Sequence, residues 1–342
     1  MSENIPAHLE YLFSLERLGT KLGLGPIGEL LERCGNPHRD LPIMQIAGTN
    51  GKGSTAAMTA RILQEHGEVV GLYTSPHLLG LHERIRIDGL PVEDEYVQGW
   101  LERFREDIEA IPATFFEATT ALALSYFRER RVGVAILETG LGGRLDATTA
   151  TTPAWTAITP IAMDHMDLLG DSLAAIAWEK AGILKPGVPC YSAAQTPEVE
   201  KVLQSEAERV GTSVTFVDPR QEVPAPRRLA GGHQWANARL AWNLAKAVLE
   251  SRFKLDVARK AIESAFWPGR YQLLGTRPRT IFDVAHNPHG AAAFMETMKQ
   301  EKVQGERWLV LALQEGKRAE QLLNMLAPKF DHTIATQTNT RH

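Results

Sequence analysis

The stretch Ala47-Gly48-Thr49-Asn50-Gly51-Lys52-Gly53-Ser54 decides the fold, because it joins a short apolar run to a longer helical pattern. The apolar run covers residues 42–47, and the helical pattern covers residues 54–65. Glycines let a backbone wrap closely, so that successive amides converge on phosphate oxygens at the start of a helix. We expect Lys52 to neutralise phosphate charge and the Ser54 hydroxyl to bind Mg²⁺. The alternative is a glycine-rich turn without a ligand, and Gly53 sets the stretch apart from the usual Walker A pattern.

Further apolar runs alternate with amphipathic stretches on both sides of this loop, which is typical of a buried parallel sheet covered by helices. Strands are predicted at 69–74, 134–138, 155–159, 188–192 and 213–217, and helices at 93–108, 117–130 and 172–184. After residue 270 the pattern restarts, with strands predicted at 280–285, 308–313 and 332–336 and helices at 288–299 and 319–326.

The chain is therefore predicted to have an α/β fold with two domains. Residues 1–271 form a phosphate-loop domain with a mostly parallel sheet. Residues 272–342 form a smaller Rossmann-like α/β domain, which we expect to be truncated at its C-terminal end because three strands make a small sheet.

Composition narrows the class of protein. The 342 residues carry a formal net charge of -4, and 44% of them are hydrophobic. Nucleic acid is excluded as the main partner, because its binding needs a concentrated basic face. Cys34 and Cys190 are far apart and form no thiolate metal site. No apolar run reaches the length of a membrane span, so we expect a cytoplasmic monomer that binds no membrane.

Several carboxylates and bases follow predicted strands, where open α/β sheets bind ligands. Glu138 ends a buried strand beside the phosphate loop and is a candidate Mg²⁺ ligand, although many such carboxylates are only solvated. His165 follows another strand, and a lone histidine is more often structural. Lys180 follows in a predicted helix, and the alternative to a functional role is that it is a solvated lysine on that helix.

The second domain adds a strand that ends in Asp283-Val284-Ala285-His286-Asn287 before a helix. Asp283 is suited to accept hydrogen bonds from ribose hydroxyls, and His286 to contact a nucleotide. Arg270 is a candidate clamp on phosphate charge. The alternative is a capped strand–helix turn with a surface arginine.

Taken in order, these segments resemble the folylpolyglutamate synthase/dihydrofolate synthase family of the Mur ligase superfamily. The matching stretches are Ser14–Arg17, Ala47–Ser54, Leu72–Leu78, Glu83–Ile87, Gly140–Asp146, Asp164-His165, Glu179–Gly182, Gly232–Gln234 with Asn237, Trp267–Arg270 and Asp283–Pro288. Relatives in this family continue past the position of His342, which again implies a truncated second domain.

The resemblance implies an ATP-dependent ligase that phosphorylates a carboxylate of dihydropteroate or a reduced folate and then joins it to the amine of L-glutamate. It implies nucleotide contacts from Gly48, Thr49, Asn50, Gly51, Lys52, Gly53, Ser54, Asn237, Arg270, Asp283 and His286. It implies Mg²⁺ ligands from Ser54, Ser75, Glu138 and His165, and catalytic roles for Lys52, His165, Arg270 and a carbamylated Lys180. Substrate contacts are implied for Ser75, Pro76, His77, Arg84, Arg144 and Asp146, with Thr74–Leu78 and Glu83–Ile87 as pterin-side loops.

Two alternatives stay open. Another Mur-type ligase that acts on a peptidoglycan precursor would share the phosphate loop, glutamate, histidine and lysine, but not the stretches Ser14–Arg17 and Ser75–Leu78. A nucleotide-binding protein without ligase turnover is the other. For Arg144 and Asp146, an ion pair within a turn is the alternative to a substrate role.

Overall fold

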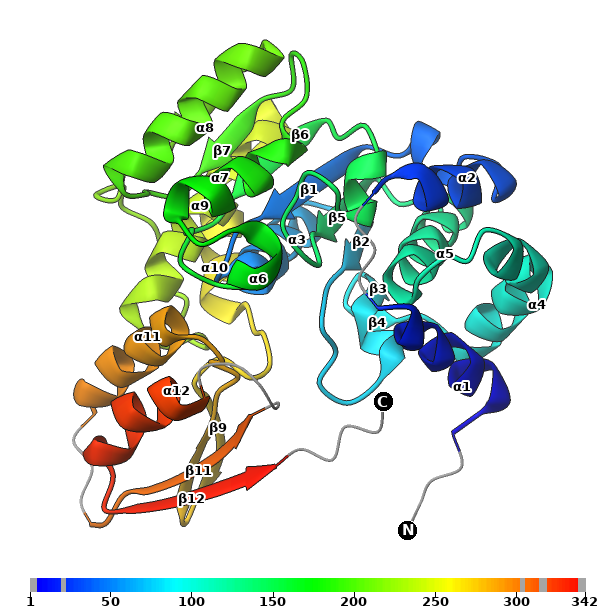
Figure 1. The fold of residues 1–342 in the computed structure, drawn as a ribbon. Coiled ribbons are helices and arrows are strands. Elements are labelled where there is room, and N and C mark those ends of the chain that lie inside the picture. The colour runs from blue at the N-terminus through cyan, green and yellow to red at the C-terminus, as the bar shows by residue number, and fades with distance from the viewer. Residues whose placement is uncertain (1–4, 20–22, 302–304, 314–318, 338–342) are drawn as a thin grey trace.

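The computed structural model describes residues 5–19, 23–301, 305–313 and 319–337, and it is built around one large sheet (Figure 1). This sheet has eight strands in the order β4-β3-β2-β5-β1-β6-β7-β8. The strands are β1 (Ile43–Ala47), β2 (Val70–Tyr73), β3 (Ile85–Ile87), β4 (Leu90–Pro91), β5 (Val134–Glu138), β6 (Trp155–Ile158), β7 (Cys190–Ser192) and β8 (Val214–Phe216). All neighbours pair in parallel except β3 and β4, which add an antiparallel edge to β2. The predicted mostly parallel sheet is therefore confirmed.

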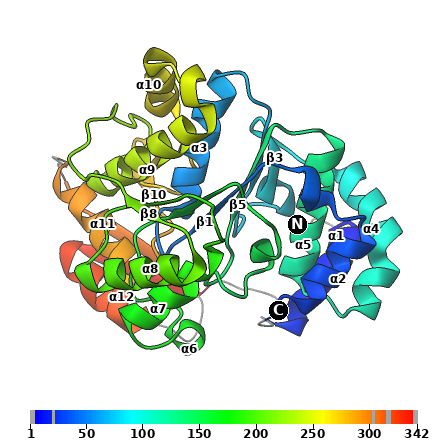
Figure 2. The same cartoon turned by 90° about the horizontal axis from the view of Figure 1, so that it is seen from above.

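Helices cover both faces of this sheet (Figure 2). One face carries α1 (Ala7–Ser14), α2 (Gly25–Arg33), α4 (Asp94–Ala110), α5 (Phe115–Glu129), α7 (Leu173–Lys180) and α8 (Pro197–Val210). The other face carries α3 (Lys52–Glu65), α9 (Gly232–Leu249) and α10 (Leu255–Ser264). Because both faces are covered, every residue of the central strands β1 and β5 is buried, and their sequences are mostly apolar instead of alternating, as in other parallel sheets.

The register of the central strands aligns the residues that follow them. In β1, Ile46 is paired with Glu138 of β5, and Ala47 is paired with Ile158 of β6. The loop after Ala47 therefore begins between the ends of both neighbours. Parallel strands put their carboxyl ends at one edge, which is where this fold class binds ligands.

A smaller body follows the large sheet. It contains the antiparallel pair β9 (Gln272–Thr276) and β10 (Arg279–Phe282), the parallel pair β11 (Trp308–Leu313) and β12 (His332–Gln337), and the helices α11 (Pro288–Lys299) and α12 (Ala319–Leu326). Tyr271, Met295, Leu309 and Leu322 are part of its core. The division at residues 271 and 272 stays a prediction.

Two predicted elements differ most from the observed ones in where they end. The strand expected at 280–285 ends at Phe282, because the carboxylate of Asp283 accepts hydrogen bonds from the amides of Tyr271 and Ala285 and turns the chain. The helix expected at 172–184 ends at Lys180 and continues as a 3-10 turn. Among the described residues, no helix combines the length and apolarity needed to cross a bilayer.

Candidate active site

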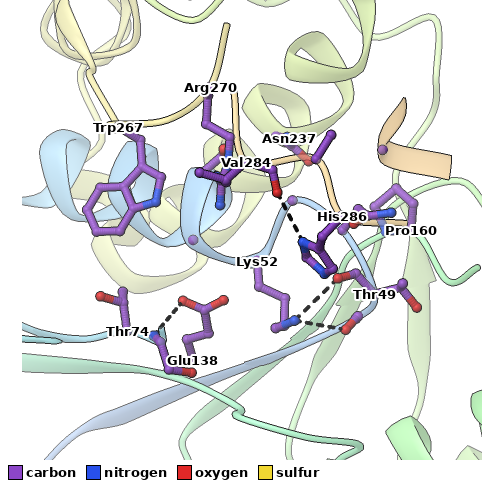
Figure 3. A pocket seen from close by; sticks show the side chains of 18 of the residues that line it. Thr49, Lys52, Thr74, Glu138, Pro160, Asn237, Trp267, Arg270, Val284 and His286 are labelled. Atoms are coloured by element: carbon purple, nitrogen blue, oxygen red, sulfur yellow. Dashed lines mark hydrogen bonds between the residues drawn. The ribbon is translucent and has the colours of Figure 1, made fainter. Parts of the chain in front are cut away.

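A cavity of about 510 Å³ lies at the carboxyl ends of the central strands and is closed by residues of the smaller body. Figure 3 shows Lys52 and Glu138 on one side, with Trp267, Arg270 and His286 facing them. Sixteen of the residues expected at the site line this cavity: Gly48, Thr49, Asn50, Gly51, Lys52, Gly53, Ser54, Ser75, Pro76, Glu138, His165, Lys180, Asn237, Arg270, Asp283 and His286.

The phosphate loop uses its glycines for space as well as for conformation. Gly48 and Gly51 have φ angles of +146° and +90°, a region that side chains with a Cβ rarely adopt. A Cβ at Gly48 would overlap the Thr159 hydroxyl, and one at Gly51 would overlap the Asn237 amide. At these two positions the loop packs so tightly against its neighbours that only a glycine, which has no Cβ, fits.

Two polar side chains of this loop are poised for anionic and cationic ligands. Lys52 Nζ donates to the carbonyls of Gly48 and Thr49, at 3.2 and 3.3 Å, and so stays at the start of α3. Ser54 Oγ is buried and has no hydrogen-bond partner among the described residues. A buried hydroxyl without a partner loses free energy, and a bound cation would recover it.

Glu138 lies at the floor of the cavity, at the end of β5. Its carboxylate is buried and accepts a hydrogen bond from the Ser75 amide at 3.3 Å. Burial raises the pKa of Glu138, although the positive charge of Lys52 opposes this rise. A buried carboxylate beside a phosphate loop gains most from a divalent cation, because the cation compensates for the lost solvation.

Lys180 is the second buried cation of the cavity. Its Nζ donates to the Gly48 carbonyl at 2.8 Å. Burial lowers the pKa of Lys180 to about 7, and the nearby charge of Lys52 adds to this effect. A large fraction of the Lys180 amine is therefore neutral at pH 7. A neutral amine is the nucleophilic form.

Hydrogen bonds across the cavity join the phosphate loop to the smaller body. The side-chain amides of Asn50 and Asn287 donate to each other's oxygens, at 3.1 Å in both directions. The Asn287 amide also donates to Asp164 Oδ2 at 2.8 Å. Burial would raise the pKa of Asp164, but its interactions with His286, His165 and Asn287 hold it well below the usual range.

The other nucleotide-site candidates are held by local contacts. Asp283 uses its two oxygens to accept from the amides of Tyr271 and Ala285, at 2.7 and 2.8 Å. Arg270 donates to its own neighbour, the Gly269 carbonyl, and burial lowers the pKa of its guanidinium. Asn237 donates to Gln234 on the same helix at 3.0 Å.

Four expected substrate residues do not line the cavity, and Arg144 is the one with the strongest contacts elsewhere; its substrate role stays a prediction. Its guanidinium donates to Glu206 at 2.8 Å and to the Trp178 carbonyl, and it lies 3.6 Å from the centre of the Trp178 ring. These contacts fix Arg144 against α7 and α8. The alternative, an ion pair between Arg144 and Asp146, is absent from the described contacts, because Arg144 pairs with Glu206 instead.

Asp146, His77 and Arg84 also lie outside the cavity lining, and the substrate roles expected for them stay predictions. Asp146 is buried and accepts from the amides of Gly140 and Leu141, so it shapes the glycine-rich loop after β5. Arg84 is buried, donates to His77 Nδ1 at 2.8 Å and lies 4.9 Å from the centre of the Phe115 ring. These side chains support the cavity wall from behind.

Comparisons with known proteins agree with this geometry. Residues 46–190 match the Mur ligase middle domain, and residues 269–342 match the Mur ligase glutamate ligase domain. The dihydrofolate synthase/folylpolyglutamate synthase of Bacillus subtilis (strain 168) is 36% identical over an alignment of 316 positions, and the alignment covers 83% of this chain and 74% of that protein.

The chain belongs to the folylpolyglutamate synthase/dihydrofolate synthase family.

Solved structures of this family extend the match to three dimensions. The Mycobacterium tuberculosis folylpolyglutamate synthase complexed with ADP has a TM-score of 0.86 and 32% identity, with 98% of this chain and 83% of that chain covered. A folylpolyglutamate synthase complex with AMPPCP and folate has a TM-score of 0.81 and 28% identity, with coverages of 98% and 97%. The expected truncation of the second domain is not confirmed by these matches.

The cavity also contains side chains that were given no individual role from the sequence, although Arg86 belongs to the stretch expected on the pterin side. Trp267, His233 and Arg86 line it, and Asp164 and Asn287 connect its two sides. Asn287 precedes Pro288 and caps α11 by accepting from the Gly290 amide at 2.8 Å. This Asn-Pro signal predicts a helix start, but not the partner of the remaining amide nitrogen.

Proposed function

We propose that this protein is an ATP-dependent ligase that joins the amine of L-glutamate to a carboxylate of dihydropteroate or of a reduced folate. The observation that carries the proposal is the combination of phosphate loop, unpartnered Ser54 hydroxyl and buried Glu138 in one cavity. The family membership and the relatives complexed with ADP, or with AMPPCP and folate, support it.

The phosphates of ATP would lie along the loop from Gly48 to Ser54. The loop amides and the start of α3 favour negative charge there. Lys52 would exchange its contacts with the loop carbonyls for phosphate oxygens, and Arg270 would approach from the opposite wall. The role of both cations is to stabilise charge on the transferring phosphoryl group.

Mg²⁺ fits the oxygen atoms on the other side of the loop. Ser54, Ser75 and Glu138 would hold the cation, with His165 at the rim of the cavity. Mg²⁺ held by these residues would supply positive charge that offsets part of the phosphate charge. The unpartnered Ser54 hydroxyl and the buried Glu138 carboxylate are the features of this chain that fit such a cation.

The reaction needs an activated carboxylate. A carboxylate is a poor electrophile until phosphorylation converts one oxygen into a leaving group. The amine of glutamate then attacks the acyl phosphate, forms the amide bond and releases inorganic phosphate. The described residues contribute by positioning the two substrates and by excluding water between the large sheet and the smaller body.

Lys180 is proposed to be carbamylated, as the family resemblance suggests. Its buried amine, with a pKa of about 7, is neutral often enough to react with CO₂. The product would carry a negative charge near the positive charge of Lys52. Lys52 and Lys180 both donate to the Gly48 carbonyl, so the repulsion between their two positive charges would become an attraction between opposite charges. Cytoplasmic localisation and the monomeric state stay predictions.

Product formation with purified protein, ATP, Mg²⁺ and L-glutamate tests the function. Dihydropteroate and a tetrahydrofolate are supplied in separate reactions, each with and without glutamate. We expect glutamylated product and ADP in at least one complete reaction, and none with the Lys52→Ala variant, which should keep the fold. ATP hydrolysis that ignores both acceptors would contradict the proposal, and nucleotide binding without turnover would favour the nucleotide-binding alternative.

A further inference from the structure

Arg86 presents a cationic side chain to the cavity from the sheet edge. It is the middle residue of β3, and its neighbours Ile85 and Ile87 pack under the helices on the other face. Because successive side chains in a strand point to opposite faces, Arg86 faces the side of α3. It lines the cavity, and its guanidinium carbon lies 5.1 Å from the centre of the Trp267 ring.

The guanidinium of Arg86 keeps free hydrogen-bonding capacity. Its Nε is buried and has no hydrogen-bond partner among the described residues. The nearest carboxylate is that of Glu83, with N···O at 3.6 Å, which is longer than a hydrogen bond. Glu83 Oε1 accepts from the backbone amides of Leu78, Leu79 and Gly80 instead. Arg86 is therefore held in place by Trp267 and Glu83 without being satisfied by them.

The substrates of the proposed reaction carry carboxylates that do not react. Glutamate reacts through its amine, so both of its carboxylates must be bound as anions. A folate acceptor with a terminal glutamyl residue carries one reacting carboxylate and one that does not react. Dihydropteroate carries only the reacting carboxylate. Arginine binds a carboxylate through two parallel N–H···O bonds, and its planar fork matches that geometry.

Lys52 and Arg270, which line the same cavity, already have a role in the proposed function as the cations that would contact the phosphates. We propose that Arg86 binds a non-reacting carboxylate of an amino-acid or glutamyl substrate. In this proposal the guanidinium of Arg86 is positioned by its contact with the indole of Trp267. This inference rests on the proposed ligase function and adds the residue that recognises the glutamyl group. Trp267 positions the guanidinium, since a cation above an indole face is attracted to it.

The test compares Arg86→Met and Arg86→Lys with the wild-type protein. Methionine keeps an apolar stem on Trp267, and lysine keeps the charge but loses the planar fork. KM is measured separately for ATP, glutamate, dihydropteroate and a tetrahydrofolate. Loss of a charge-assisted hydrogen bond should raise one KM by about 10- to 100-fold in Arg86→Met, with a smaller rise in Arg86→Lys.

The two sources of the carboxylate give different patterns. If glutamate supplies it, the KM for glutamate rises with either acceptor. If the folate acceptor supplies it, the KM for tetrahydrofolate rises while the KM for dihydropteroate does not change. Arg103→Met is the matched control, because it removes an exposed cation 4.9 Å from the Phe104 ring on α4, outside the cavity. It should leave every KM unchanged.

Glutamine used in place of glutamate provides a second check in the glutamate case. If Arg86 binds the side-chain carboxylate, wild type and Arg86→Met should use glutamine equally poorly. The inference is overturned if both Arg86 variants form product with unchanged KM for glutamate and folate, or if only kcat or the KM for ATP changes. Failure of the wild-type protein to form any glutamylated product would contradict the ligase function instead.

Discussion

Replacing Asn287 by alanine should separate the smaller body from the phosphate loop. Asn287 is 1% exposed, and its amide donates to Asn50 and Asp164 while its oxygen accepts from Asn50 and the Gly290 amide. Loss of an N-cap costs about 1 kcal/mol. A hydrogen bond to an ionised carboxylate contributes about 1.5–3 kcal/mol, and each neutral one about 1 kcal/mol.

Some of this free energy returns, because water can solvate the half-exposed Asn50 and Asp164 after the substitution. We therefore expect the substitution to reduce the free energy that holds the smaller body against the phosphate loop by about 3 kcal/mol. Backbone hydrogen exchange measures this locally. Amides of α11 and of β9 to β12 should exchange roughly 100-fold faster in Asn287→Ala, while those of β1 and β5 should change little.

Asn243→Ala is the control for this experiment. Asn243 is a half-buried residue of α9 whose amide donates to Gln221 and to the Arg239 carbonyl, so its contacts stay within the large body. Its substitution should leave exchange in α11 unchanged. The reasoning is refuted if Asn287→Ala protects α11 as well as the wild type does, or if Asn243→Ala exposes α11 equally.

Three other results are expected. Gly51→Ala should weaken ATP binding more than tenfold in calorimetric titration, because a Cβ at φ +90° would overlap the Asn237 amide. Gly67→Ala is the control: Gly67 also has a positive φ, +89°, but has open space around it, so this variant should bind ATP normally. Lys180→Ala should depress ligation, and short-chain carboxylic acids should restore part of it by supplying the carbamate's negative charge; full activity without acid would contradict carbamylation. Burial lowers the pKa of Lys180 from 10.5 to about 7, so between these pH values the unfolded state binds one proton more than the folded state. The free energy of unfolding should therefore rise with pH across this window. Urea titrations at several pH values measure this rise, and Lys180→Met should remove it.

The sequence was sufficient to predict the elements that carry the phosphate loop. Strands β1, β5 and β6 were predicted to within one residue at each end, because buried parallel strands have continuous apolar sequences and end at glycine or polar residues. The position of Glu138 follows from the same pattern. Local sequence also predicted α11 and α12 with their observed bounds.

Contacts between distant segments could not be predicted in this way. The partner of Asn287 is Asn50, which is 237 positions earlier in the chain. A substrate role for Arg144 was implied by the resemblance, and the sequence did not predict that Glu206 on α8 would bind it at 2.8 Å. Residues 85–87 were assigned to a pterin-side loop by resemblance and form strand β3 instead. In each case the outcome depends on tertiary packing, which a local pattern does not contain.

The central position of β1 has a consequence for how the protein is made. Its neighbours β5 and β6 are both synthesised much later than β1 itself, and the chain must reach Ile158 before both sides of β1 are paired. At a translation rate of roughly 5–20 residues per second, this delay lasts several seconds. During that time β1 and the phosphate loop after it lack at least one of the two neighbouring strands. The phosphate loop is therefore early in the sequence but late in folding, and the nascent chain should depend most on chaperones in this interval.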